Sequence, residues 1–130
     1  MNGYKVLRTD LTHNNYTYKP GQINYLDKPF EREGSCVKGG LYYTTLEHIH
    51  KFFEYGDLVY KVTVPDDAEF VQDPEEDKWR ASALELSERC WTFVEFVKEF
   101  STQTKWAVEW ASSNGHLDVV KYLVEECNAV

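Results

Sequence analysis

Histidines are the first residues of this 130-residue sequence that could do chemistry. His48 and His50 lie two residues apart in a segment whose pattern predicts a helix, so they point in different directions and cannot share a metal ion. His13 stands beside Asn14 and Asn15, where it could act as a catalytic base or form the hydrogen bonds of a turn. We expect the turn role, and no metal site built from histidines.

Cysteines offer no clearer chemistry. Cys36, Cys90 and Cys127 are too far apart for a CxxC metal or redox site, and an odd number cannot pair completely into disulfides. Cys36 lies close to Lys38 and a pair of glycines, a setting in which a thiol can be reactive, but the spacing selects no histidine partner. We therefore predict a reduced, intracellular protein with no cysteine nucleophile.

Acidic residues gather in the segment from Asp73 to Asp77, which also contains Pro74. The segment lacks the glycine and the spaced ligands of a calcium loop. Gly39 and Gly40 likewise lack the GxxxxGK[ST] frame of a phosphate loop. We predict a solvated acidic loop, no metal and no cofactor.

Net charge is distributed unevenly along the chain. The total is −8, but residues 1–65 carry 8 basic and 7 acidic side chains, whereas residues 66–130 carry 6 basic and 15 acidic ones. Without clustered Lys and Arg we expect no nucleic-acid partner, and an acidic second half suits a basic or mixed protein surface. No stretch reaches the roughly 18 apolar residues of a membrane span, so we expect no membrane association.

The elements that must position these residues predict an α+β fold, with a small mixed-sheet domain over residues 1–86. A helix is expected from about residue 45 to 55, because Thr44 and Glu47 have capping-box spacing and Gly56 can end the helix in the left-handed conformation. Residues 58–64 alternate as a half-buried strand does. Strands are predicted at residues 4–7, 16–18, 41–43, 58–64, 69–71 and 82–86.

A helical extension is predicted after the sheet domain. Ser87 resembles an N-cap, and residues 87–100 place their aromatic and aliphatic side chains on one stripe, so residues 87–103 form a connecting amphipathic segment. Residues 104–112 and 117–126 read as two short helices separated by Asn114 and Gly115. We therefore predict a helical hairpin over residues 104–130.

Residues 107–125, Ala-Val-Glu-Trp-Ala-Ser-Ser-Asn-Gly-His-Leu-Asp-Val-Val-Lys-Tyr-Leu-Val-Glu, resemble an ankyrin repeat. The usual Thr-Pro-Leu-His is replaced by Trp-Ala-Val-Glu at residues 106–109, and the usual closing glycine by Cys127. The sequence of this segment is similar to that of ankyrin proteins of mimivirus-type giant DNA viruses. Residues 39–44, 60–68 and 78–81 resemble the N-terminal domain that precedes the repeats in that family.

The resemblance implies a non-catalytic protein-protein interaction module of a viral ankyrin-type protein, in which the front domain caps a helical repeat surface. Ankyrin repeats are stable only when stacked, and residues 104–130 provide one unit, so the hairpin must dock on the 87–100 helix. We expect Trp91 and Trp106 to pack across that junction. By resemblance, Trp110, Ser113 and Asn114 face the concave groove and contact the partner, a host or viral protein, in the host cytoplasm or the virion.

A second resemblance leaves an enzyme open. The run Gly-Leu-Tyr-Tyr-Thr-Thr at residues 40–45, leading into a helix and an alternating strand, is similar to ADP-ribosyltransferases. It implies that the tyrosines stack on the nicotinamide of NAD, that His13 contacts the ribose, and that Glu69 or Glu85 is catalytic, or that an inactive derivative binds NAD. Alternatively, the tyrosines fill the sheet core. A tyrosine-lined cleft between residues 41–44 and 58–64 would favour the enzyme.

Overall fold

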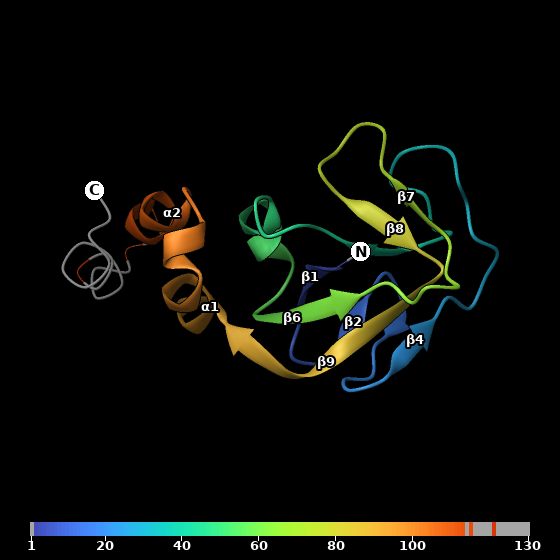
Figure 1. Cartoon of the computed structure of the whole chain (residues 1–130), viewed down its shortest axis with the longest axis horizontal. Coiled ribbons are helices and arrows are strands. Elements are labelled where there is room, and N and C mark those ends of the chain that lie inside the picture. Colours follow the sequence, from blue (N-terminus) through green and yellow to red (C-terminus); the bar gives the residue numbers. More distant parts are fainter. Residues whose placement is uncertain (1, 114, 116–120, 122–130) are drawn as a thin grey trace. The chain divides into compact units, whose positions relative to one another are not determined.

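The computed structural model describes residues 2–113, 115 and 121 of the chain, and strands dominate it (Figure 1). The predicted fold class is wrong. The described residues form three sheets in place of one small mixed sheet, and they do not show the ankyrin-like helical hairpin, although strands and helices are both present. Contacts divide the chain into two compact units, Met1–Cys90 and Trp91–Val130.

The largest sheet of the first unit has four strands. In spatial order they are β1 (Asn2–Leu7), β6 (Leu58–Thr63), β9 (Ala83–Thr92) and β4 (Ile23–Tyr25). The strand predicted for residues 58–64 is confirmed, and its alternation holds from Tyr60 onward, where Tyr60, Val62 and Val64 are buried and Lys61 is exposed; Val59, predicted on the other side, is buried as well. The side chains of Tyr60, Val62 and Val64 join one core cluster with Leu7, Tyr18, Leu41, Tyr43, Ala81, Leu84 and Leu86.

Two smaller sheets complete the first unit. One contains β5 (Leu41–Tyr43), β8 (Trp79–Ala81) and β7 (Phe70–Gln72) in that order, and the other is the hairpin of β2 (Thr12–His13) and β3 (Tyr16–Thr17). Strands β1 and β5 meet where Tyr4 and Thr44 exchange backbone hydrogen bonds of 2.7 and 2.9 Å. Gly3 permits this approach, because a Cβ atom there would overlap the carbonyl oxygen of Thr44.

The helix predicted for residues 45–55 is shorter than expected and of a different type. The structure has the 3-10 helix η1 (Ile49–Tyr55). Thr44 does not cap it, because its backbone pairs with Tyr4 and its hydroxyl donates to the carbonyl oxygen of Asp77 at 2.7 Å. Gly56 is not left-handed but extended, and a side chain there would overlap the backbone of Leu7. The close approach of the Leu7 backbone, and not a left-handed conformation, therefore explains the glycine at position 56.

The helix predicted to begin at residue 87 begins later. Residues 87–92 continue strand β9, and Ser87 does not cap a helix, because its hydroxyl accepts the amide of Lys61 on β6 at 3.1 Å and donates to the carbonyl of Arg89. The N-cap is Thr92, which forms a reciprocal capping box with Glu95. Pairing with a neighbouring strand therefore overrides the helical periodicity of this segment.

The second unit contains α1 (Phe93–Glu99), the 3-10 helix η2 (Ser101–Gln103) and α2 (Ala107–Ser113). Trp106 is 8% exposed and stacks on Phe96 with ring centroids 6.5 Å apart, while Trp91 contacts Phe96 and Phe100 edge-on. The predicted packing is confirmed for Trp106, which contacts a ring of α1. The rings that Trp91 contacts belong to its own segment, residues 87–100, so its packing across the junction stays a prediction. The predicted second helix of the hairpin, residues 117–126, lies outside the described residues apart from position 121.

Candidate functional site

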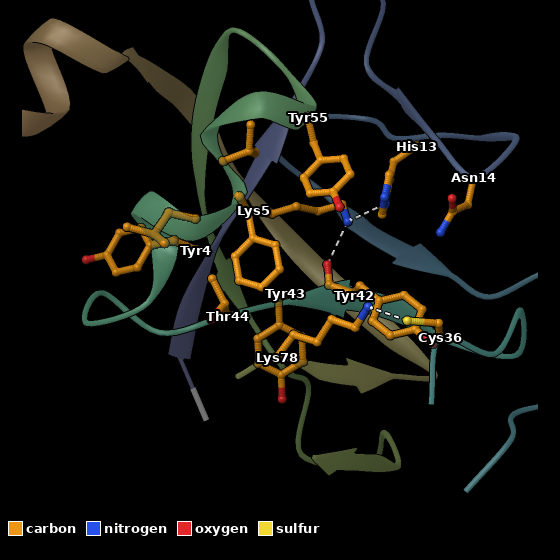
Figure 2. A pocket seen from close by; sticks show the side chains of 13 residues that line it. Tyr4, Lys5, His13, Asn14, Cys36, Tyr42, Tyr43, Thr44, Tyr55 and Lys78 are labelled. Carbon is orange, nitrogen blue, oxygen red and sulfur yellow. Dashed lines mark hydrogen bonds between the residues drawn. The ribbon is translucent and has the colours of Figure 1, made fainter. Parts of the chain in front are cut away.

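A cavity of about 240 Å³ opens in the first unit, among β1, β2, β5 and η1 (Figure 2). Among the described residues, its wall includes four tyrosines, two lysines and one histidine, and no aspartate or glutamate. The cavity is thus lined by tyrosines, as the enzyme alternative required. Its place differs from the expected one, because the described residues that line it with β5 come from β1 and not from β6. The tyrosines are Tyr4, Tyr42, Tyr43 and Tyr55.

Lys5 on β1 is the most unusual residue of this wall. The residue is only 4% exposed, and its ammonium donates hydrogen bonds to the backbone oxygen of Tyr42 at 2.6 Å and to Nδ1 of His13 at 3.0 Å. Its Nζ atom also lies 4.9 Å from the centre of the Tyr18 ring. Burial, and secondarily the positive charge of Lys78, lowers the pKa of Lys5 to about 7. The amine therefore exchanges its proton near neutral pH.

His13 is held by the β2-β3 hairpin, whose turn residues Asn14 and Asn15 have φ angles of 51° and 63°. Two consecutive positive φ angles are typical of the tight turns that join antiparallel strands. Burial, then the charges of Lys5 and Lys78, lowers the pKa of His13 to about 3, so its ring is neutral at physiological pH. While Lys5 is protonated, its ammonium can only donate, so Nδ1 accepts and the proton of the neutral ring is on Nε2.

Lys78 precedes β8 and lies at the other side of the cavity. Its Nζ atom is 3.0 Å from Glu76, 3.2 Å from the Cys36 sulfur and 4.7 Å from the centre of the Tyr42 ring. Burial lowers the pKa of Lys78, but its hydrogen bonds to Glu76 and Cys36 outweigh burial and raise it. Lys78 is therefore a charged lysine with a carboxylate partner, unlike Lys5.

Asp73 fixes the loop that carries Cys36. It was expected in a solvated acidic loop, but it is 2% exposed, and it accepts hydrogen bonds from the Cys36 amide at 3.0 Å and the Ser35 hydroxyl at 2.7 Å. Burial raises the pKa of Asp73, but these hydrogen bonds and one from the Glu75 amide outweigh burial and lower it to about 2. Asp73 is therefore a charged structural acceptor.

Arg80 secures the same loop from below. Its side chain is fully buried, donates to the backbone oxygens of Glu31 and Gly34, and lies 3.8 Å from Asp73. Gly40 leaves room for it, because a Cβ atom there would lie 2.6 Å from the Arg80 side chain. No sequence pattern pointed to this arrangement, because Glu31 and Gly34 lie 49 and 46 positions before Arg80.

The catalytic glutamates expected by resemblance do not reach the cavity. Glu69 is exposed and paired with Arg32 at 2.6 Å, and Glu85 is an exposed residue of β9 opposite Ile23. Neither lines the cavity that contains His13 and the tyrosines. Among the residues that the structure describes, no three His, Cys, Asp or Glu side chains gather as metal ligands would.

The predicted partner-contact residues belong to the second unit. Trp110 on α2 is half-buried and meets the Phe93 ring edge-on, with centroids 6.2 Å apart. Ser113 is exposed at the end of α2, and Asn114 lies outside the described residues. Within the described part of the chain, no helix combines the length and the apolar character that crossing a membrane requires.

Several proteins of Acanthamoeba polyphaga mimivirus are similar to this chain over most of its length. "Putative ankyrin repeat protein R868" is 31% identical over 94% of this chain and 66% of its own length. "Putative ankyrin repeat protein R229" is 37% identical over 90% of this chain and 43% of its own length. "Putative ankyrin repeat protein L100" is 32% identical over 94% of this chain and 22% of its own length.

The chain therefore spans about two thirds of the first of these relatives and less than half of the other two. No family model matches the chain. No solved structure matches it significantly.

Proposed function

We propose that this chain, a homologue of mimivirus proteins named putative ankyrin repeat proteins, is a non-catalytic protein-interaction module of a viral protein. The observation that carries the proposal is the similarity itself, which covers 90–94% of the chain in these relatives. Proteins built from ankyrin repeats use their extended surfaces to bind other proteins. The site of action on this proposal is the host cytoplasm or the virion.

The contact surface proposed for the partner is the face of α2 that carries Trp110 and Ser113. Tryptophan is enriched among the residues that dominate interface energies, particularly where its ring is held in place before binding. The edge-on contact with Phe93 supports such preorganisation, while half-burial leaves part of the indole accessible. Because residues 66–130 are strongly acidic, the proposed partner has a basic or mixed surface.

The alternative, an ADP-ribosyltransferase-like enzyme or an inactive NAD-binding derivative, has less support. The tyrosines and His13 do share one cavity, but no carboxylate lines it. Its volume of about 240 Å³ also falls below the roughly 300 Å³ at which pockets for drug-sized ligands begin. On the proposed function, millimolar NAD leaves the melting temperature unchanged; an increase would favour the alternative.

Affinity purification with the wild-type chain and two variants tests the proposed surface. Trp110→Ala removes the proposed anchor, and Tyr25→Ala removes an aromatic ring that is 65% exposed on β4 of the first unit. Lysates of infected host cells and disrupted virions supply the candidate partners, which are quantified by mass spectrometry. We expect proteins that the wild type and Tyr25→Ala retain and that Trp110→Ala loses at least about tenfold. Equal recovery by all three folded chains would contradict the proposed surface.

A further inference from the structure

We propose that the cavity among β1, β2, β5 and η1 binds a small anion carried on an aromatic ring, with the Lys5 ammonium as its counter-ion. This binding activity goes beyond the proposed interaction function. It involves only residues of the first unit, whereas the proposed partner surface lies on α2 in the second unit.

The charges around the cavity call for an anion. The chain as a whole carries −8, yet the lining contains Lys5, Lys78 and His13 and no carboxylate. Lys78 already has Glu76 as its partner at 3.0 Å. Lys5 bonds only to neutral acceptors among the described residues, the backbone oxygen of Tyr42 and the ring nitrogen of His13. A buried cation without a counter-charge is costly, and an entering anion would remove that cost.

The size and the walls of the cavity favour an aromatic carrier for that charge. About 240 Å³ is enough for one substituted ring and too little for a larger ligand. Tyr42, Tyr55 and Phe52 contribute aromatic rings to the lining, and aromatic rings pack favourably against one another face to edge or offset. Figure 2 shows the Lys5 amine between His13 and the backbone of Tyr42 on β5. The charged amine therefore lies within the aromatic enclosure.

His13 supplies a second polar group of the right kind. Since its Nδ1 accepts from Lys5, its Nε2 bears the proton and is a hydrogen-bond donor. Asn14 lines the same cavity and adds an amide that can donate. The groups that this wall offers an incoming ligand thus include two neutral donors beside the amine, as recognition of a carboxylate or phosphate oxygen requires.

Calorimetry with four probes of similar shape tests the proposal on the full chain. Benzoate and phenyl phosphate are anionic, benzamide is neutral and benzylamine is cationic. We expect at least one of the two anions to bind at least tenfold more tightly than benzamide, and benzylamine to bind no better than benzamide. The proposal is overturned if neither anion reaches that tenfold preference, or if benzylamine binds as well as the anions.

Two further measurements identify Lys5 as the counter-ion. Lys5→Met should reduce the affinity for the preferred anion at least tenfold and leave benzamide binding within about threefold, whereas Lys61→Met, which removes an exposed lysine on β6, should change neither. If Lys5→Met does not fold, the probe preference and the proton uptake of the wild-type chain still test the proposal. At pH 8.5 anion binding should take up about one proton, measured from heats in two buffers of different ionisation enthalpy. Binding without proton uptake would exclude Lys5.

The proton uptake has one expected source. The titratable groups that line the cavity with Lys5, or pack on it, are His13, Tyr18, Cys36, Lys78 and the four tyrosines Tyr4, Tyr42, Tyr43 and Tyr55. Burial raises the pKa values of Tyr18, Tyr42 and Tyr43, so these tyrosines already hold their protons at pH 8.5, and the raised pKa of Lys78 keeps it charged. The pKa of His13 is about 3, far too low for it to be protonated at this pH. Lys5, whose pKa is about 7, is the group that recharges. Cys36→Ser removes the thiol and should leave the proton uptake unchanged, whereas loss of the uptake in this variant would assign it to Cys36 and not to Lys5.

Discussion

Nζ of Lys5 lies 3.0 Å from Nδ1 of His13, and in the described part of the chain neither side chain has a carboxylate partner. A lysine and a histidine that share a hydrogen bond in a buried place cannot both be charged at little cost. Burial is the largest cause of both lowered pKa values, that of Lys5 at about 7 and that of His13 at about 3; the charge of Lys78 lowers both further, and the charge of Lys5 also lowers that of His13. This pair makes the cavity wall sensitive to pH near neutrality.

Lys5 should make the stability of the first unit depend on pH. Its folded pKa, about 7, lies below its ordinary value of 10.5, so between these values the unfolded chain binds more protons. The free energy of unfolding therefore rises with pH through this window, by up to about 1.4 kcal/mol per unit from this residue. Urea unfolding at pH 7.5, 8.5 and 9.5 measures this dependence of the free energy of unfolding on pH.

Two variants separate this contribution from those of other groups. Lys5→Met should remove most of the slope, while Lys61→Met, an exposed lysine, should keep it. A wild type and a Lys5→Met variant with the same slope would show that Lys5 is charged and solvated in the folded chain.

Asp73 should be the most important residue of the acidic loop for stability. Asp73→Ala removes the acceptor of the Ser35 and Cys36 hydrogen bonds and leaves the buried Arg80 without its carboxylate, which should cost about 3 kcal/mol. Asp67→Ala, at an exposed turn position, should cost less than about 0.5 kcal/mol. Urea unfolding at pH 7 compares the stabilities of the two variants. An equal loss of stability in both would support the solvated acidic loop that the sequence predicted.

Acid should weaken the same loop. The pKa of Asp73 is lowered to about 2 from 3.8, so its stabilising charge is fully present above about pH 4 and is lost as the pH falls towards 2. The wild type should therefore lose stability in this range, and Asp73→Ala should lose less. Parallel decreases in the two chains would count against a charged Asp73.

The start of α1 can be tested at single-residue resolution. Thr92→Ala breaks the capping box with Glu95 and should destabilise the helix by about 1 kcal/mol. Ser87→Ala removes the acceptor of the hydrogen bond that the Lys61 amide donates to β9, and should leave the helix intact. Backbone chemical shifts of residues 93–99 report the helix. Loss of helical shifts in Ser87→Ala and not in Thr92→Ala would show that the sequence-based boundary was correct.

Strand β6 and helix α1 show how far the sequence was informative. The alternation at residues 58–64 predicted β6 correctly because strand periodicity and burial agree there from Tyr60 onward. The capping signals at Thr44 and Ser87 predicted wrong helix starts, because residues distant in sequence engage both positions. Thr44 pairs its backbone with Tyr4, and the Ser87 hydroxyl accepts a hydrogen bond from the Lys61 amide. Local patterns cannot report such competition.

Sequence reasoning found part of the cavity and missed its most unusual residue. The tyrosines and His13 were expected together on the basis of a resemblance, and the structure does bring them to one wall. Lys5 gave no signal, because a lysine in a short strand is ordinarily exposed and its partner Tyr42 is 37 positions away. Burial of this amine follows only from the meeting of β1 with β5 and the β2-β3 hairpin.

The two tryptophans of the second unit should differ in their effect on stability. Trp106→Ala removes a buried ring that stacks on Phe96 and should cost about 3 to 5 kcal/mol. Trp110→Ala removes a half-buried ring with an edge-on contact to Phe93 and should cost about 1 kcal/mol. Thermal unfolding followed by far-ultraviolet circular dichroism compares them. If Trp110→Ala were the more damaging, Trp110 would be a core residue and not an accessible anchor.

The most direct measurement is the titration of the Lys5 side chain itself. Selective ¹³C labelling of lysine and NMR spectra from pH 5 to 11 follow each ammonium separately, and Lys5→Met assigns the signal. We expect a midpoint near 7 for Lys5, and a higher midpoint when benzoate is bound. A midpoint near the ordinary 10.5 would mean a solvated or ion-paired amine, and would contradict both the buried Lys5-His13 pair and the anion site built on it.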